Sequence, residues 1–132
     1  MQTFAVRLLP GQDLKESLKQ LVVEKNIRAG VVLTCVGSLQ KAVLRMADEN
    51  IINTYEERFE IVSLVGTLSA DGVHLHAALS RANGEVIGGH VSDGCTIYTT
   101  AEIVVADVPD VIFKRVHDEQ TGFKELVVES TM

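Results

Sequence analysis

The sequence predicts an α+β fold in which a mainly antiparallel sheet packs against one helix. Hydrophobic residues make up 46% of the 132 residues, while aromatic residues make up 5% and tryptophan is absent. The core must therefore consist mainly of Val, Leu, Ile and Ala, and the many β-branched residues favour strands. Only one segment has helical periodicity, and seven or eight strand-like segments are joined mostly by short turns, which permit antiparallel neighbours. The length fits a single domain over residues 1–132.

The amino-terminal part predicts a strand followed by the helix. Residues 3–8 alternate in polarity like a strand, and Pro10 and Gly11 break the pattern. Residues 13–26 predict a helix, because Asp13 followed by Glu16 is typical of an N-terminal cap. The helix has one apolar stripe, which consists of Leu14, Leu18, Leu21 and Val22.

The remaining segments predict strands. Residues 29–39 form a continuous apolar run typical of a strand buried on both faces, and residues 40–48 predict a neighbouring strand that turns at 48–50. Further strands are predicted at 57–69, 73–80, 86–94 and 95–108, followed by a closing hairpin of 112–118 and 123–129.

Charge and cysteine content limit the classes of function. The formal net charge is −6, and Lys and Arg are not clustered, so we do not expect direct binding to duplex DNA. Cys35 and Cys95 stand alone in apolar surroundings, which indicates two buried thiols in a reducing compartment. The amino terminus does not resemble a signal peptide, and no apolar run approaches the roughly 18 residues that would span a bilayer. We therefore expect a cytoplasmic protein without a membrane association.

Three of the four histidines lie between residues 72 and 90. His74 and His76 project from the same face of a strand, about 7 Å apart, because side chains alternate along a strand. Two imidazoles at this spacing can reach one zinc ion, and His90 would complete a site with an open position. Alternation alone also produces such pairs, so a metal site and a hairpin with three histidines remain equal alternatives.

The position of His90 depends on the geometry of the turn between the two strands. If Asn83 and Gly84 formed a two-residue turn, His90 would face Ala77 and point to the opposite face from His76. A one-residue shift, from a bulge or a looser turn, would bring it back, and Gly88 and Gly89 are residues that tolerate a bulge. The alternative role of the two glycines is close backbone packing against another strand or subunit.

Two carboxylates are further candidates for chemistry. Glu102 lies inside an apolar strand and needs a partner, which could be a ligating histidine or an arginine at a subunit contact. Asp93 follows His90 closely. The sequence contains neither a phosphate-binding loop nor a recognisable nucleophile motif, and His117 is expected at the surface.

Three segments resemble the plant-and-prokaryote-conserved (PPC) domain, which follows AT-hooks in plant nuclear proteins and stands alone in prokaryotes. They are residues 29–39, 58–69 and 74–105, and the last holds the H-x-H pair, the glycine turn and the G-G-H sequence in family order. With the opening strand and helix, the resemblance covers nearly the whole chain. It implies a seven-stranded, mostly antiparallel sheet with one main helix, assembled as a homotrimer.

The resemblance also implies functional residues. The prokaryotic histidine set corresponds to His74, His76 and His90, with zinc or another divalent transition metal as the natural occupant. A partner-binding motif of the plant proteins corresponds to Arg58, Phe59, Glu60 and Ile61, although Glu57 replaces its glycine and Val62 its leucine. The AT-hook itself is absent, so a DNA-binding label would reflect family likeness only.

Two functions follow as hypotheses. The first is a cytoplasmic homotrimer with a three-histidine metal site that acts as a binding or regulatory module, with other proteins as further partners. The alternative is a metal-dependent enzyme of hydrolase or lyase type, with Glu102 or Asp93 as acid or base.

Overall fold

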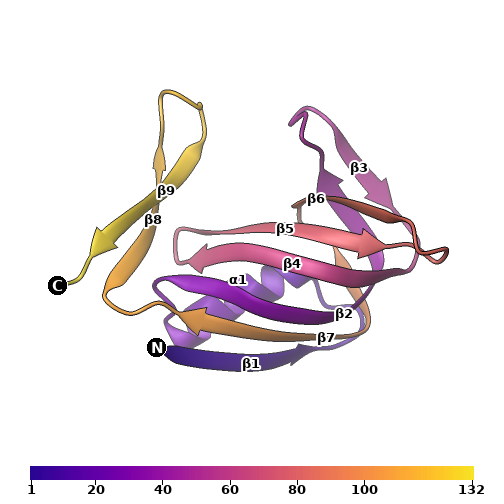
Figure 1. The fold of residues 1–132 in the computed structure, drawn as a ribbon, viewed down its shortest axis with the longest axis horizontal. Helices are drawn as coiled ribbons and strands as arrows, with labels where there is room; N and C mark the ends of the chain where they lie inside the picture. The colour runs from indigo at the N-terminus through magenta and orange to yellow at the C-terminus, as the bar shows by residue number, and fades with distance from the viewer.

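Seven strands form one antiparallel sheet in the computed structural model, which describes residues 1–132 (Figure 1). The sheet order is β1-β7-β2-β4-β5-β6, with β3 paired to β2. The elements are β1 (Gln2–Leu8), α1 (Leu14–Lys25), β2 (Gly30–Arg45), β3 (Ile52–Tyr55), β4 (Phe59–Ser69), β5 (Gly72–Ser80), β6 (Val86–Val91), β7 (Thr96–Asp107), β8 (Val111–His117) and β9 (Lys124–Ser130). The α+β fold with a seven-stranded antiparallel sheet and one helix is thus confirmed.

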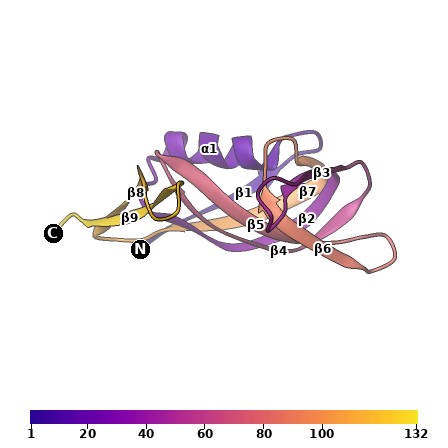
Figure 2. The ribbon, with the colours of Figure 1, turned by 90° about the horizontal axis from the view of Figure 1, so that it is seen from above.

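Helix α1 lies across one face of the sheet (Figure 2). Asp13 caps it as predicted, because its Oδ1 accepts a hydrogen bond of 2.9 Å from the backbone N–H of Glu16. The other carboxylate oxygen, Oδ2, accepts one of 2.6 Å from the N–H of Gly94. The cap therefore also fixes the helix to the loop before β7. The predicted apolar stripe of the helix is buried against the sheet. No helix of the chain has the length and hydropathy needed to cross a bilayer.

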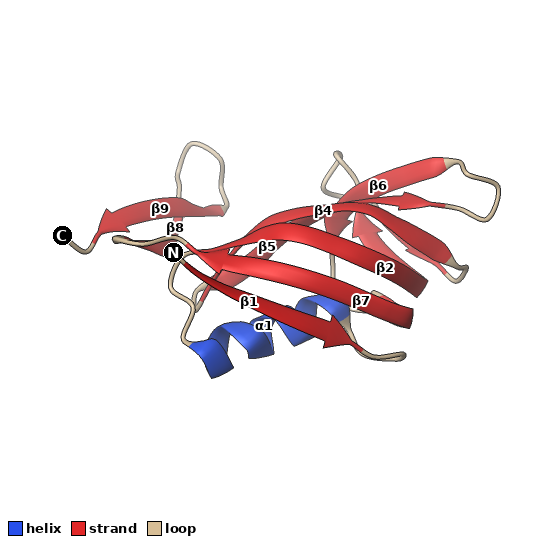
Figure 3. Ribbon diagram, turned by 60° about the horizontal axis from the view of Figure 1, so that its bottom comes forward, coloured by secondary structure: helices blue, strands red, loops and turns tan.

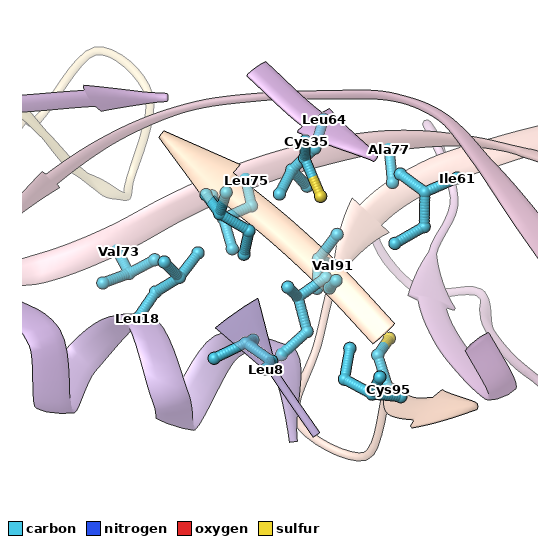
Figure 4. Close-up of a cluster of buried hydrophobic side chains, with 14 of the residues drawn as sticks. Leu8, Leu18, Cys35, Ile61, Leu64, Val73, Leu75, Ala77, Val91 and Cys95 are labelled. Carbon is cyan, nitrogen blue, oxygen red and sulfur yellow. The ribbon is translucent and has the colours of Figure 1, made fainter. Parts of the chain in front are cut away.

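The core fills the space between α1 and the sheet and includes both cysteines (Figure 4). Its side chains alternate along each strand: in β5, Val73, Leu75 and Ala77 are buried, while the residues between them face the other side. Figure 4 labels Leu8, Leu18, Cys35, Ile61, Leu64, Val73, Leu75, Ala77, Val91 and Cys95 of this core. The core consists mainly of Leu, Val, Ile and Ala, as the composition predicts.

Strand β2 differs from the prediction of two separate strands at 29–39 and 40–48. It runs without a break from Gly30 to Arg45, with three register shifts against β7. Such irregularities bend a strand and interrupt its alternating pattern, so one strand has the sequence pattern of two. The last part of β2 pairs with β3, a four-residue strand that the sequence did not predict.

The bend gives β2 a second set of neighbours at its end. Its first part lies between β7 and β4, whereas its end pairs with β6 through Leu44–Val91 and Arg45–His90. Strand β6 therefore lies between β5 and the end of β2. This arrangement positions the histidine site.

Strands β8 and β9 form a separate hairpin that stands away from the main sheet (Figure 3). Arg115 of β8 joins it to the loop between β4 and β5, since its backbone N–H donates a hydrogen bond of 3.0 Å to Asp71 Oδ2. Its Nη2 donates one of 2.8 Å to Thr67 Oγ1 of β4. The connection between β8 and β9 contributes Phe123 to the surroundings of the histidines.

Candidate metal site

His74, His76 and His90 lie together on the face of the sheet that is turned away from α1. His74 and His76 alternate with buried residues along β5, and His90 of β6 pairs in register with His76. Each histidine offers a ring nitrogen, and these three atoms lie within 4.8 Å of one another. The ring centroids are 5.0, 5.2 and 5.6 Å apart. Three imidazoles thus converge on one point.

A looser turn brings His90 to the correct face. The loop holds three residues, because Arg81 and Glu85 close it through a backbone hydrogen bond of 2.8 Å from Arg81 N–H to Glu85 O. Gly84 takes a left-handed conformation with φ of 88°, as three-residue hairpin loops require. The register is constant from Ser80–Val86 to His76–His90, so a bulge at Gly88 and Gly89 is not the cause of the shift.

Gly88 and Gly89 instead allow close packing of β6 between its two neighbours. A Cβ on Gly88 would lie 2.6 Å from the carbonyl oxygen of Ala77 in β5. A Cβ on Gly89 would lie 2.8 Å from the carbonyl oxygen of Arg45 in β2. Backbone packing against another strand, the alternative role of these glycines, is therefore what the structure contains.

The surroundings favour neutral imidazoles. Burial and then the positive charge of Arg45 lower the pKa of His90 to about 4. Burial, followed by Arg115 and His76, also lowers the pKa of His74. A neutral imidazole nitrogen is the form that binds a metal. The Nδ1 atom of His90 is buried without a hydrogen-bond partner, so it is available as a ligand. The three residues therefore fit a transition metal.

A cavity of about 470 Å³ opens beside the histidines. Its walls come from β2, β5, β6 and the hairpin of β8 and β9, and they carry both charges: Arg45, Arg115 and Lys124 are basic, and Asp71 and Glu125 are acidic. No local sequence pattern distinguishes Arg45 or Arg115. Arg45 lies within the strand predicted at 40–48. Only its pairing with His90, between β2 and β6, shows that it belongs to the site.

The two other candidate carboxylates lie elsewhere. Glu102 is exposed on β7, opposite Arg7 of β1 and Val36 of β2, and lines a different groove. Asp93 is exposed in the loop after β6 and does not line the cavity. His117 is exposed on β8, as expected, and does not join the cluster. The structure therefore does not bring Glu102 or Asp93 to the histidines.

The segment from Arg58 to Ile61 is only partly exposed. Phe59 and Ile61 are buried in the core, whereas Arg58 and Glu60 are exposed. The guanidinium of Arg58 stacks over the ring of Tyr98, 4.4 Å from its centroid. Only two of the four side chains could therefore contact a partner directly.

Comparison with known proteins identifies relatives along the whole chain. The model of the Plants and Prokaryotes Conserved (PCC) domain, the family named PPC above, matches residues 1–109. Two Synechococcus strains have proteins named bifunctional protein GlmU that are 47% and 48% identical over 129 residues. The match covers 98% of this chain, but this chain spans only about a fifth of the length of those proteins.

Solved structures share the fold. A hypothetical protein of Salmonella enterica is 37% identical with a TM-score of 0.95, and the match covers 99% of this chain and 95% of that one. A metal-containing protein of Archaeoglobus fulgidus is 28% identical with a TM-score of 0.85, over 96% and 94% of the two chains. A PPC protein of Pyrococcus horikoshii, 23% identical over 100% and 94% of the chains, has a TM-score of 0.80 and shares the fold. By its sequence and its fold, the chain belongs to the Plants and Prokaryotes Conserved domain family.

Proposed function

We propose that this protein binds a divalent transition metal through His74, His76 and His90. The observation that carries the proposal is the convergence of three ring nitrogens within 4.8 Å. In addition, His90 has a buried ring nitrogen, Nδ1, without a hydrogen-bond partner. The metal-containing relative from Archaeoglobus fulgidus supports it. Zinc is the preferred occupant, because three imidazoles with a fourth position left open are a common zinc environment.

The bound metal would be open to a ligand from the cavity. A zinc ion with an open position supplies Lewis acidity, which serves either the reversible binding of a ligand or the activation of water. We favour the binding or regulatory module, because neither Glu102 nor Asp93 lines the cavity. The second candidate is a hydrolase or lyase, and in that case the carboxylates that line the cavity, Asp71 and Glu125, are the candidates to move a proton.

The protein would act as a homotrimer in the cytoplasm. The open face of the sheet carries Val36 of β2 and Val62 and Val65 of β4, which are 61%, 57% and 58% exposed. Exposed apolar side chains gathered on one face favour burial against another molecule. Val65 pairs with His76 across β4 and β5, so this apolar face adjoins the histidines. A second copy of the chain would therefore lie close to the metal.

Metal analysis tests the proposed function. Untagged protein purified without chelator is measured by elemental mass spectrometry beside His76→Ala and the matched control His117→Ala, which removes an exposed histidine outside the cluster. We expect zinc or a similar metal in the wild type and in His117→Ala, and its loss from His76→Ala. A metal-free wild type, or a His76→Ala variant that retains the metal, contradicts the proposal.

A further inference from the structure

Two arginines beside the histidines have no acidic partner. The structure contains two ion pairs, and Arg81 forms both of them, with Glu57 and Glu85. Arg45 and Arg115 line the histidine cavity and form none. The two guanidiniums of the cavity are therefore free to bind another negatively charged group. Unpaired guanidiniums in a cavity are suited to an anion from outside the chain.

Arg45 is held close to the histidines by the strands. It lies opposite His90 in the pairing of β2 with β6, so both side chains project from the same face. Its Nε is buried without a hydrogen-bond partner. The ring of Phe123 packs against the guanidinium, with its centroid 5.8 Å from Cζ. A buried donor without an acceptor is costly, and a ligand oxygen would satisfy it.

Arg115 approaches the same point from the hairpin. Its Nη2 is held by Thr67, which pairs with His74 across β4 and β5. Because one nitrogen is fixed, the rest of the guanidinium is oriented with little loss of freedom when an anion binds. Both Arg115 and His74 line the same cavity, so the guanidinium lies beside the site.

The charges around the cavity favour an anion once the metal is bound. Arg45, Arg115 and Lys124 face Asp71 and Glu125, and Asp71 already accepts a hydrogen bond from the backbone of Arg115. A divalent cation held by neutral imidazoles would add two positive charges. The field at the open position is therefore positive, although the whole chain is acidic.

We propose that the ligand of this site is a small organic oxyanion, a carboxylate or phosphate, whose charged group binds Arg45 and Arg115 while a neighbouring oxygen reaches the metal. The inference rests on the proposed metal site. Since Arg115 lies beyond the residues that the family model matches, the carboxyl-terminal hairpin would supply part of the selectivity. Guanidiniums bind such groups through paired, charge-assisted hydrogen bonds, which gives both affinity and orientation.

Isothermal titration calorimetry of the zinc-loaded protein tests this inference. The probes are glycolate, its neutral counterpart glycolamide, and inorganic phosphate. We expect glycolate to bind roughly tenfold more tightly than glycolamide, or better, because only glycolate offers a charged group to the arginines. The comparison of glycolate with phosphate shows which oxyanion the site prefers.

Variants assign the binding to the arginines. Arg45→Gln and Arg115→Gln should each weaken glycolate binding about tenfold or more and leave the zinc content unchanged. Arg45→Lys keeps the charge and should fall between the wild type and Arg45→Gln. The matched control is Arg28→Gln, which removes an exposed arginine outside the cavity and should bind like the wild type. Thermal unfolding of each variant shows that it is folded.

Three outcomes overturn the inference: equal binding of glycolate and glycolamide, glutamine variants that bind glycolate like the wild type, or glutamine variants that lose zinc together with the anion. The last would mean that the arginines only support the metal site or the hairpin. If the wild type holds no zinc, the proposed function fails separately. In that case phosphate is titrated into the metal-free wild type and into metal-free Arg45→Gln. Equal phosphate binding by the two proteins would overturn the role of Arg45 in binding an anion.

Discussion

At the scale of single residues, neighbouring side chains determine chemistry that the residue type leaves open. His90 is an example: its burial, and then the positive charge of Arg45 on the neighbouring strand, lower its pKa to about 4. The two cysteines show the same principle. Burial, with a smaller contribution from Glu102, raises the pKa of Cys35 to about 11, and burial also raises the pKa of Cys95.

These shifts predict that the thiols of the folded protein are unreactive. The thiolate is the reactive form, and a raised pKa leaves little of it near pH 7.5. We expect slow reaction of both cysteines with a chromogenic disulfide reagent in the folded protein and rapid reaction in guanidinium chloride. The rate for Cys35, measured in Cys95→Ala, should rise only as the pH approaches about 11. Rapid labelling of the folded protein at pH 7.5 would contradict the predicted burial.

At the scale of elements, the position of β6 between β5 and β2 determines the site. The sequence predicted the hairpin of β5 and β6 and raised a looser turn as one way to bring His90 back. The sequence could not distinguish a looser turn from a bulge. Both are compatible with the same order of residues, and they differ only in which residues of β5 lie opposite which residues of β6. The register of His76 with His90 is decided by the three-residue loop and by the second neighbour, β2.

A substitution at Gly89 tests this packing. Gly89→Ala places a Cβ 2.8 Å from the carbonyl oxygen of Arg45, and backbone there cannot move without disturbing the pairing of β6 with β2. We expect the free energy of unfolding in urea to fall by about 1–3 kcal/mol. Metal content should fall too, because His90 is the next residue. As a control, Val86→Ala changes an exposed residue of the same strand and should alter stability by about 0.5 kcal/mol or less. A fully stable Gly89→Ala protein would show that β6 is not confined.

At the scale of the whole molecule, the apolar face of the sheet predicts self-association. Light scattering should give the mass of a trimer for the wild type, and Val62→Glu should shift the protein toward the monomer because it would bury a charge in the interface. Val23→Glu is the matched control, since Val23 is 78% exposed on the opposite, helical side and should leave the mass unchanged. A monomeric wild type would contradict the trimer and leave the metal site to a single chain.

The charge of the whole molecule leads to a prediction about DNA. With a net charge of −6 and no cluster of basic residues, the protein should not retard duplex DNA in a gel, even at low salt, where attraction between basic groups and phosphates is strongest. The two arginines at the metal site are too few to hold a duplex. Retardation that weakens steeply as salt is added would contradict this expectation.

The sequence by itself determined most of the elements and the family. Asp13 and the apolar stripe specified the helix, β-branched alternation specified most strands, and the H-x-H and G-G-H segments carried the resemblance, because each of these signals lies within a short stretch of chain. Tertiary structure alone decided the unbroken course of β2, the pairing of β3, the separation of Glu102 and Asp93 from the histidines, and the approach of Arg45 and Arg115 to them. These features depend on strand register and on contacts between residues far apart in the chain, which local patterns do not encode.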